Sequence, residues 1–426
     1  TMRYRTKNEM KDSGIEWIGK IPDDWDINKF KYSTILINKT IENSDFSIAL
    51  ENIQSWTGKY NTTDTEYDSS GTKFNKGDIL FGKLRPYLAK VYLANQSGKA
   101  IGDIYVFRGK KYLPGYLFYL IDSHNFINIV NSSTYGSRMP RASWDFIGNL
   151  ETTLPPLSEQ QAIAHYLDRK TEAVDALIEK KEQLIEKLNE KRQALITRAV
   201  TKGLHPDVPM KDSGIEWLGE IPGHWEVWKA SHAFKKIGSG TTPKSDNLEY
   251  YDGDILWITT SELRENEIYD TKSKLSSKAI HDFSSLDIYD KNSVIIAMYG
   301  ATIGRLGIMK EKATVNQACC VFSDSQKIDY KFFYYWIYSA RPIIISHSYG
   351  GGQPNINQEY LKSLHIPVPN MSEQKEIVKY IDNKTESMDF LIQKNDYLIS
   401  KLKEYRQSLI SAAVTGKIDV REEVSA

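Results

Sequence analysis

Polar, glycine-hinged loops are the segments of this 426-residue chain whose side chains have an evident chemistry. Glycine lets a backbone approach a phosphate closely, and Arg, Lys, Gln and Asn match the hydrogen-bonding pattern of base edges in the major groove. The candidate contacts to nucleic acid are Lys83, Arg85, Arg138, Arg141, Thr241, Lys244, Arg305, Gln353 and Asn355. The alternative interpretation is that these loops are plain surface turns with solvated charges.

The loops occur in corresponding pairs. The pairs are 81–86 with 299–305, 135–141 with 349–355, and 238–244 with a segment near 38–40. In the second pair, Arg138 and Arg141 are replaced by Gly352 and Asn355, although the glycine-rich frame is kept. Different donors favour different base edges. The sequence therefore predicts that the two loop sets select unlike sites, so that a combined target is asymmetric.

No catalytic signature accompanies these loops. The chain lacks a Gly-x-x-x-x-Gly-Lys-Ser/Thr phosphate loop, and the glycine-rich segment 237–244 lacks dinucleotide-binding spacing. Pro155 and Pro156 lie between leucines rather than in the Asn/Asp-Pro-Pro-aromatic motif of amino-methyltransferases. The histidines show no zinc-ligand spacing, and the two cysteines, Cys319 and Cys320, are adjacent. We therefore expect no catalytic residue, no metal site and no cofactor in this chain.

The bulk composition is that of a globular protein, with 40% hydrophobic and 26% charged residues. The formal net charge is +0, so no global field attracts nucleic acid, which slightly favours a protein-binding function. No apolar run approaches the roughly 20 residues that a membrane span requires, and no signal peptide is evident. Because cysteine is scarce, a reducing compartment fits best, and we expect a cytoplasmic protein without membrane contact.

The elements that carry the loops are duplicated. The octapeptide 10–17 returns unchanged at 210–217, and Ser-Glu-Gln at 158–160 returns at 372–374. Between these anchors the two copies barely resemble each other. Both copies mix short β-rich runs, turn signals and a helix-like apolar segment. The chain thus repeats one frame and diversifies the space inside it, as expected for two different α+β domains.

Each copy is followed by a long amphipathic segment. Its apolar residues repeat at steps of three, four and seven, which is the a/d spacing of a coiled coil. The predicted seam residues are Ile163, Leu167, Val174, Leu177, Leu184, Leu188 and Leu195 in the first segment, and Ile377, Ile381, Met388, Leu391, Leu398, Leu402 and Leu409 in the second. Each helix would run for about 40 residues, or about 60 Å. Because both follow a globular domain in the same order, a pseudo-two-fold axis predicts antiparallel pairing.

Four isoleucines lie one step beyond this seam. They are Ile178, Ile185, Ile392 and Ile399. Either they widen the core between the helices or they bind a partner protein, and the sequence leaves both interpretations open. A further alternative is that each helix packs only on its own globular domain, although a stripe of about five heptads favours a second helix as the partner.

The expected fold class is α+β. Two α/β globular domains are separated by two long helices that form an intramolecular, pseudo-two-fold symmetric antiparallel coiled coil. The predicted segments are 1–154 and 204–368 for the globular domains, and 155–203 and 369–426 for the helical regions.

Nearly the whole chain resembles the specificity (S) subunits of type I restriction-modification systems. The resemblance is carried by 14–22 with Trp25, 214–222 with Trp225, 154–163, 366–377, and the helix ends 191–196 and 404–410. One Pro-x-x-Ser-Glu-Gln motif would be weak evidence. Its double occurrence, in order and at the right spacing, makes the resemblance specific.

This resemblance implies two target recognition domains and two conserved helical regions, without catalysis. Each domain would bind one half of an asymmetric bipartite target in double-stranded DNA. The helices would set the spacer and dock two methyltransferase (M) subunits, through which restriction translocase (R) subunits bind. S-adenosylmethionine and ATP with Mg would belong to those partners. A rival hypothesis is a coiled-coil scaffold that joins two protein-interaction domains and binds no DNA.

Overall fold

The computed structural model describes residues 3–65, 67–134, 139–348 and 355–421. Contacts between residues divide the chain into two compact units. Unit 1 comprises Thr1–Gln183 and Asn395–Ala426, and unit 2 comprises Leu184–Lys394. This division crosses both long helices, whereas the predicted segment boundaries lie at the helix ends.

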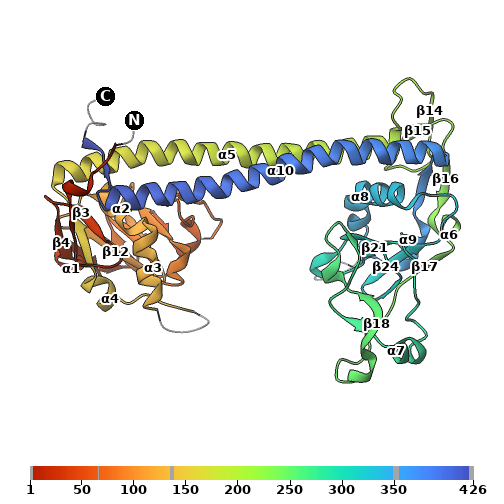
Figure 1. The fold of residues 1–426 in the computed structure, drawn as a ribbon, viewed down its shortest axis with the longest axis horizontal. Coiled ribbons are helices and arrows are strands. Elements are labelled where there is room, and N and C mark those ends of the chain that lie inside the picture. Colours follow the sequence, from red (N-terminus) through yellow and green to blue (C-terminus); the bar gives the residue numbers. More distant parts are fainter. Residues whose placement is uncertain (1–2, 66, 135–138, 349–354, 422–426) are drawn as a thin grey trace. The chain divides into compact units, whose positions relative to one another are not determined.

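Unit 1 contains an α/β globular part with two four-stranded sheets (Figure 1). The first sheet has the strand order β10 (Val91–Leu93), β9 (Ile79–Gly82), β12 (Ile104–Gly109) and β5 (Thr34–Ile37). The second sheet has the order β6 (Thr40–Ile41), β8 (Gly71–Phe74), β11 (Gly98–Ala100) and β7 (Ser47–Ile48). The helices of six residues or more are α2 (Pro114–Asp122), α3 (His124–Ser132) and α4 (Trp144–Asn149), and α1 (Phe30–Ser33) is a single short turn. Ile79 and Phe81 of β9 join the core that contains these helices, whereas Leu80 joins a second core. Strand β9 is therefore an unbroken apolar run, because both of its faces are buried.

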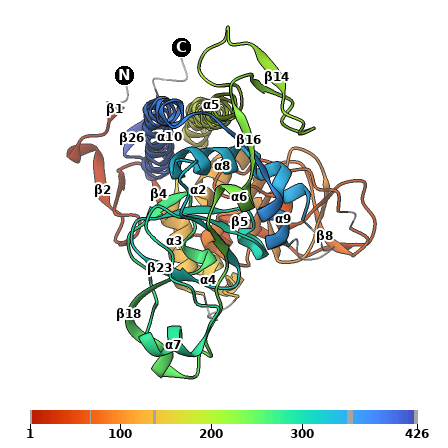
Figure 2. The ribbon, with the colours of Figure 1, turned by 90° about the vertical axis from the view of Figure 1, so that its right-hand side faces the viewer.

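Unit 2 contains a globular part of the same type. Its two larger sheets contain, in order, β17 (Lys236–Gly238), β24 (Cys319–Ser323), β21 (Val294–Ala297), β22 (Leu306–Met309) and β19 (Asn266–Ile268), and β20 (Lys274–Leu275), β18 (Tyr251–Ile258) and β23 (Ala313–Val315). Two smaller sheets pair β14 (Met210–Asp212) with β15 (Glu220–Pro222) and β16 (Glu226–Lys229) with β25 (His365–Val368). Helix α8 (Tyr330–Ser346) corresponds to α2, while β18 and α7 (Ser277–Asp282) project from the end of this part that is far from α8 (Figure 2). Val294 and Ile296 pack in the core that contains α8, and Ile295 packs in another.

The two long helices are α5 (Leu157–Lys202), with 46 residues, and α10 (Met371–Val414), with 44. They run antiparallel within each unit. In unit 1, Lys181 Nζ donates to Asn395 Oδ1 at 3.1 Å, and Arg406 Nε donates to Asp175 Oδ1 at 3.0 Å. The numbers fall along α5 as they rise along α10, which only antiparallel pairing allows. In unit 2, Ile196 of α5 shares a core with Ile377 and Ile381 at the start of α10.

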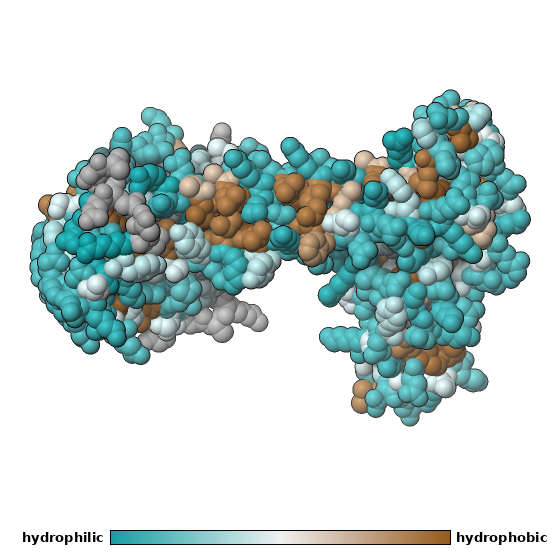
Figure 3. Space-filling model, turned by 45° about the horizontal axis from the view of Figure 1, so that its top comes forward, coloured by the Kyte–Doolittle hydropathy of each residue, from teal (hydrophilic) through white to brown (hydrophobic). Residues whose placement is uncertain are grey.

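The seam between these helices departs from the predicted one near its middle. Leu177, Leu184 and Leu391 are 44%, 46% and 43% exposed, so the seam prediction is wrong at these three positions. Ile178 and Ile399 are instead buried, at 8% and 7% exposed. Figure 3 shows hydrophobic side chains on the surface of the long helices.

The error has a physical cause. The buried series in α5 alternates steps of four and three residues and includes polar Thr171, half-buried Lys181 and half-buried Arg192. A search for apolar residues alone skips these polar members and shifts onto the neighbouring leucines. Of the remaining predicted seam residues, Ile163, Leu167, Val174, Ile377, Ile381, Met388 and Leu409 are buried, and Leu188, Leu195, Leu398 and Leu402 are half-buried.

The glutamate of the repeated Ser-Glu-Gln motif anchors a long helix to a globular part. In unit 1, Trp25 Nε1 donates to Glu159 Oε2 at 2.8 Å. In unit 2, Trp225 Nε1 donates to Glu373 Oε1 at 2.9 Å. Both tryptophans are fully buried, so the hydrogen bond satisfies an indole donor that would otherwise be costly.

The glutamine of the motif makes the second anchor. Gln160 Oε1 accepts from the backbone N of Leu113 at 2.8 Å, and Gln374 Oε1 accepts from the backbone N of Asp329 at 2.7 Å. Leu113 and Asp329 are the N-cap residues of α2 and α8. The duplicated sequence motifs therefore duplicate one helix-to-domain junction.

Candidate nucleic-acid interface

The structure brings three of the candidate residues of unit 1 together from two separate loops. Residues Leu84 and Arg141 form an antiparallel bridge. On either side of it, the backbone N of Arg85 donates to Pro140 O at 2.8 Å, and the backbone N of Ala142 donates to the carbonyl of Lys83 at 2.8 Å. Lys83, Arg85 and Arg141 therefore lie on one small backbone frame.

Arg85 has an unusual backbone at this frame. Its φ is 51°, in the left-handed region, which costs a residue with a side chain about 1–3 kcal/mol. The Arg85 side chain is exposed. Such strain is retained where the surrounding structure holds it, and here Arg85 N is tied to Pro140 O. The frame thus presents an exposed guanidinium from a fixed backbone.

A carboxylate lies between the other two cations. Asp103 is 2.9 Å from Arg141 Nη2 and 3.7 Å from Lys83 Nζ. The hydrogen bond to Asp103 raises the pKa of Arg141 above its ordinary value. Lys83 Nζ also lies 5.1 Å from the centre of the Tyr105 ring. With Arg85, the site carries three cations and one anion, a positive balance suited to phosphates or to guanine edges.

Unit 2 repeats the same backbone frame. Tyr299 and Asn355 form the antiparallel bridge that corresponds to Leu84 and Arg141. The backbone N of Ile356 donates to Met298 O at 2.7 Å, as Ala142 N does to the carbonyl of Lys83 in unit 1. Gly300 takes the position of Arg85, and its φ of 80° is again positive.

The side chains on the two frames differ completely. Met298 stands where unit 1 has Lys83, and Asn355 where it has Arg141. The backbone N of Met298 donates to Ala318 O at 2.8 Å, just as the amide of Lys83 donates to Asp103 O at 2.9 Å. The alanine therefore replaces the carboxylate. The charged set of unit 1 is replaced by neutral groups in unit 2.

Arg305, the last residue of the 299–305 loop, has its counterpart outside the paired loop 81–86. The backbone N of Ala297 donates to Arg305 O at 2.8 Å, and the backbone N of Gly82 donates to Lys90 O at 2.9 Å. Arg305 is therefore the counterpart of Lys90 rather than of Arg85. The Arg305 side chain is exposed, whereas Lys90 Nζ turns inward and donates to Leu50 O at 2.6 Å.

Two further candidates of unit 2, Lys244 and Thr241, lie on the loop after β17. Lys244 is exposed, and Thr241 is half-buried with its carbonyl 3.3 Å from Trp257 Nε1. Thr242 Oγ1 donates to Gln317 Oε1 at 2.6 Å, which joins this loop to the residue before Ala318 on the frame. The remaining two candidates, Arg138 and Gln353, lie outside the described residues.

Sequence reasoning missed Asp103, Thr242 and Gln317. No motif marks them, because each acquires its place through pairing with a distant segment. Gly102, beside Asp103, is a local signal for a change of chain direction, but such a position by itself does not indicate a binding site.

No metal-binding arrangement occurs among the residues that the structure describes: none of their His, Cys, Asp and Glu side chains form a group of three or more able to hold an ion. Cys319 and Cys320 are free and buried, and burial raises the pKa of Cys320 to about 12. Over the same described ranges, no helix has both the length and the apolar character to cross a membrane.

The repeat visible in the two frames coincides with a known family model. The model of the type I restriction modification DNA specificity domain matches twice, at residues 22–187 and 222–399. The chain belongs to this family. Each match includes one globular part and most of the long helix that follows it, so the family repeat is the frame-and-helix unit described above.

Curated relatives are similar to this chain along much of its length. The putative type I restriction enzyme MjaX specificity subunit of Methanocaldococcus jannaschii is 24% identical over 458 residues and covers 98% of both chains. The MjaVIII specificity subunit of the same organism is 25% identical over 357 residues, covering 82% of this chain and 77% of the relative. The EcoBI specificity subunit of Escherichia coli is 25% identical over 319 residues, and the match covers 72% of this chain and 64% of the relative.

Solved structures share the fold. A chain from work on complex assembly and conformational transition of the type I R-M system superimposes with a TM-score of 0.73 at 16% identity, covering 93% of this chain and 99% of the other. The HsdS subunit from Thermoanaerobacter tengcongensis gives a TM-score of 0.51 at 16% identity, covering 93% and 98%. At this identity the likeness establishes the architecture alone, and it agrees with the expected α+β domains and long helices.

Proposed function

We propose that this chain is the DNA-recognition subunit of a type I restriction-modification complex and is itself not an enzyme. The observation that carries the proposal is the pair of matching backbone frames with different side chains. A repeated scaffold that exchanges Lys83, Asp103 and Arg141 for Met298, Ala318 and Asn355 suits two readers of unlike DNA sequences. The target is then bipartite and asymmetric, with one half bound by each globular part.

The partners follow from the same proposal. Two methyltransferase subunits dock on the long helices, and restriction translocase subunits join through them. S-adenosylmethionine and ATP with Mg are bound by those partners, not by this chain. The helices set the spacer between the two half-sites, and the complex works in the cytoplasm. Support comes from family membership and from the resemblance in fold to a chain of a type I R-M system.

A salt titration of DNA binding tests the proposal. The chain is prepared with its methyltransferase partner, and its affinity for duplex DNA is measured by gel shift or anisotropy at increasing salt. Binding through several phosphates must weaken steeply with salt, because counterions released from DNA oppose it. Sequencing of methylated adenines in a host carrying the system then gives the target.

Two outcomes would contradict the proposal. A complex that binds DNA without salt dependence, or not at all, favours the rival function of a scaffold joining two protein-interaction domains, which the net charge of +0 slightly favours. A methylation map that shows a perfect palindrome would contradict the asymmetry but leave DNA recognition standing.

A further inference from the structure

Arg406 of α10 joins three different elements of unit 1. Its Nε donates to Asp175 Oδ1 of α5 at 3.0 Å, and its Nη1 donates to the backbone carbonyl of Trp56 at 2.8 Å. Nη1 also lies 3.3 Å from Oδ2 of Asp122, the last residue of α2. One guanidinium therefore connects the two long helices with a loop and a helix of the globular part. Lysine could not make these contacts together, because it lacks the planar fork of donors.

The side chains that form this junction are buried. The side chain of Arg406 is 5% exposed, and those of Asp122 and Asp175 are 0% and 11% exposed. The Arg406 guanidinium is always charged, so removing its carboxylate partner Asp175 leaves a buried charge without compensation, which is strongly destabilising. The contact is therefore a rigid attachment rather than a surface salt bridge.

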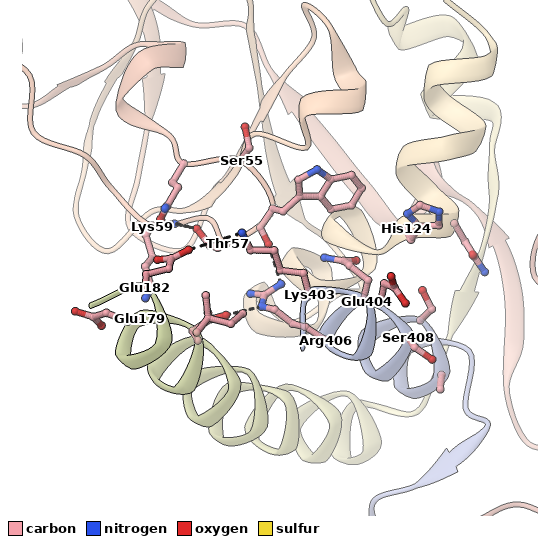
Figure 4. Close-up of a pocket in the computed structure, with 18 of the residues that line it drawn as sticks. Ser55, Thr57, Lys59, His124, Glu179, Glu182, Lys403, Glu404, Arg406 and Ser408 are labelled. Carbon is pink, nitrogen blue, oxygen red and sulfur yellow. Dashed lines mark hydrogen bonds and ion pairs between the residues drawn. The ribbon is translucent and has the colours of Figure 1, made fainter. Parts of the chain in front are cut away.

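The loop that Arg406 holds is itself constrained. Trp56 has a φ of 65°, rare for an aromatic residue, and its backbone N donates to Ala89 O at 3.0 Å. The Trp56 ring lies 5.8 Å from that of His124, at the start of α3. This loop and the two long helices line a cavity of about 1260 Å³. Figure 4 shows Arg406 at its wall, with dashed lines from Arg406 to neighbouring lining residues.

Unit 2 has a weaker version of the same junction. Arg192 occupies the corresponding seam position in α5, and its Nε lies 3.3 Å from Asp389 Oδ1 of α10. Its Nη1 donates to the hydroxyl of Tyr338 in α8 at 3.0 Å, and a neutral phenol thus replaces the buried carboxylate. The side chains of Arg192 and Asp389 are 22% and 49% exposed. A partly exposed, screened contact holds its domain less firmly.

We propose that Arg406 is a positioning residue for target spacing: it fixes the first globular part against the helix pair and thereby restricts the spacer lengths that the complex accepts, without touching a base. Arg192 does the same for the second globular part, with less effect. This inference rests on the proposed DNA-recognition function. It separates the residues that select bases, which lie on the two frames, from those that hold a frame in place.

The experiment compares spacer selectivity with base selectivity in the intact complex. The methylated target of the wild-type complex is determined first. Methylation rates are then measured on duplexes with the natural spacer and with one base pair more or fewer, for Arg406→Gln, Arg406→Lys and the matched control Arg192→Gln. The base preference of each variant is measured with single-base changes in both half-sites. Thermal unfolding of each complex reports whether it folds.

We expect Arg406→Gln to lower the ratio of natural-spacer to altered-spacer methylation about fivefold, since a charged hydrogen bond is lost. Arg406→Lys should lie between this variant and wild type, and Arg192→Gln should change the ratio less than about twofold. Base preference should stay unchanged in all three. A merely structural role would lower the unfolding temperature and leave the spacer ratio as it was.

The inference is overturned if folded Arg406→Gln keeps the wild-type spacer ratio. It is also overturned if Arg192→Gln lowers the spacer ratio as much as Arg406→Gln does. Should Arg406→Gln fail to fold, Arg406→Lys and Asp175→Ala decide, and an unchanged spacer ratio in both overturns the inference. Failure of the proposed function looks different: the wild-type complex would then have no bipartite methylated target.

Discussion

At the scale of single residues, the two units share a backbone and differ in charge. The positions that carry Lys83, Asp103 and Arg141 in unit 1 carry uncharged side chains in unit 2. The same contrast occurs at the helix junctions, where Asp122 is replaced by Tyr338. Unit 2 therefore lacks the charges of the unit 1 interface, but its helix junction keeps ion pairs, Arg192 with Asp389 at 3.3 Å and Lys331 with Asp382 at 3.0 Å.

This contrast predicts different salt dependences of DNA binding for two matched variants. Arg141→Ala removes one cation and frees Asp103, so the slope of log affinity against log salt should become shallower by about 1. Asn355→Ala, at the matching position, removes no charge and should leave the slope unchanged. Titrations of both variant complexes check this, and equal slopes would show that Arg141 does not face DNA.

The buried Asp122 predicts a specific pH dependence of stability. Burial raises its pKa from 3.8 to about 7, while Arg406 opposes the shift. The folded chain then binds this proton more tightly than the unfolded chain. The contribution to stability is fully present below the unfolded pKa and is lost as the pH rises through about 7.

Asp122→Asn should remove this dependence, because the amide does not titrate. We expect the wild-type chain to lose more thermal stability than the variant between about pH 5.5 and about pH 8.5. Asp175→Asn, whose carboxyl also contacts Arg406, serves as the comparison. Parallel stability curves for wild type and Asp122→Asn would contradict the raised pKa.

At the scale of elements, periodicity predicted the long helices and their pairing but not the whole seam. Apolar residues repeated at steps of three, four and seven were sufficient to predict the helices α5 and α10. The same count misplaced the centre of the seam, because it ignores the polar residues Thr171, Lys181 and Asn395, which occupy seam positions. Likewise, the Ser-Glu-Gln repeat was evident as a motif, yet its hydrogen bonds to Trp25 and Trp225 join residues too distant in sequence for local reasoning.

Adjacent residues in α5 test the corrected seam. Ile178 is 8% exposed and Leu177 is 44% exposed. Ile178→Ala should lower the free energy of unfolding by about 2–5 kcal/mol, because it leaves a cavity between the helices. Leu177→Ala should cost less than about 1 kcal/mol. Urea unfolding of both variants measures this difference. A larger loss of unfolding free energy for Leu177→Ala would support the seam predicted from the sequence, in which Leu177 is a member.

At the scale of the whole molecule, the candidate interface was predictable only in part. The glycine-hinged loops at Arg85 and Arg141 were found from residue type, and the structure brings them onto one frame. Residue type did not reveal Asp103, Thr242 and Gln317, since their places depend on strand pairing. The two frames differ in their side chains, but the asymmetric target stays a prediction, since the bases that each frame selects depend on docking geometry as well as side-chain type.

Lengthening both long helices tests whether they set the spacer. One heptad inserted in α5 after Lys181 and one in α10 after Asn395 keeps the apolar seam in phase and adds about 10 Å to each helix. Since one turn of duplex, 10–10.5 base pairs, spans about 34 Å, the preferred spacer should grow by about three base pairs. Methylation of duplexes with graded spacers measures the shift. The half-site sequences should stay the same, because neither frame is altered. An unchanged spacer in a folded, active complex would mean that the helices hold the recognition domains without measuring the distance between their targets.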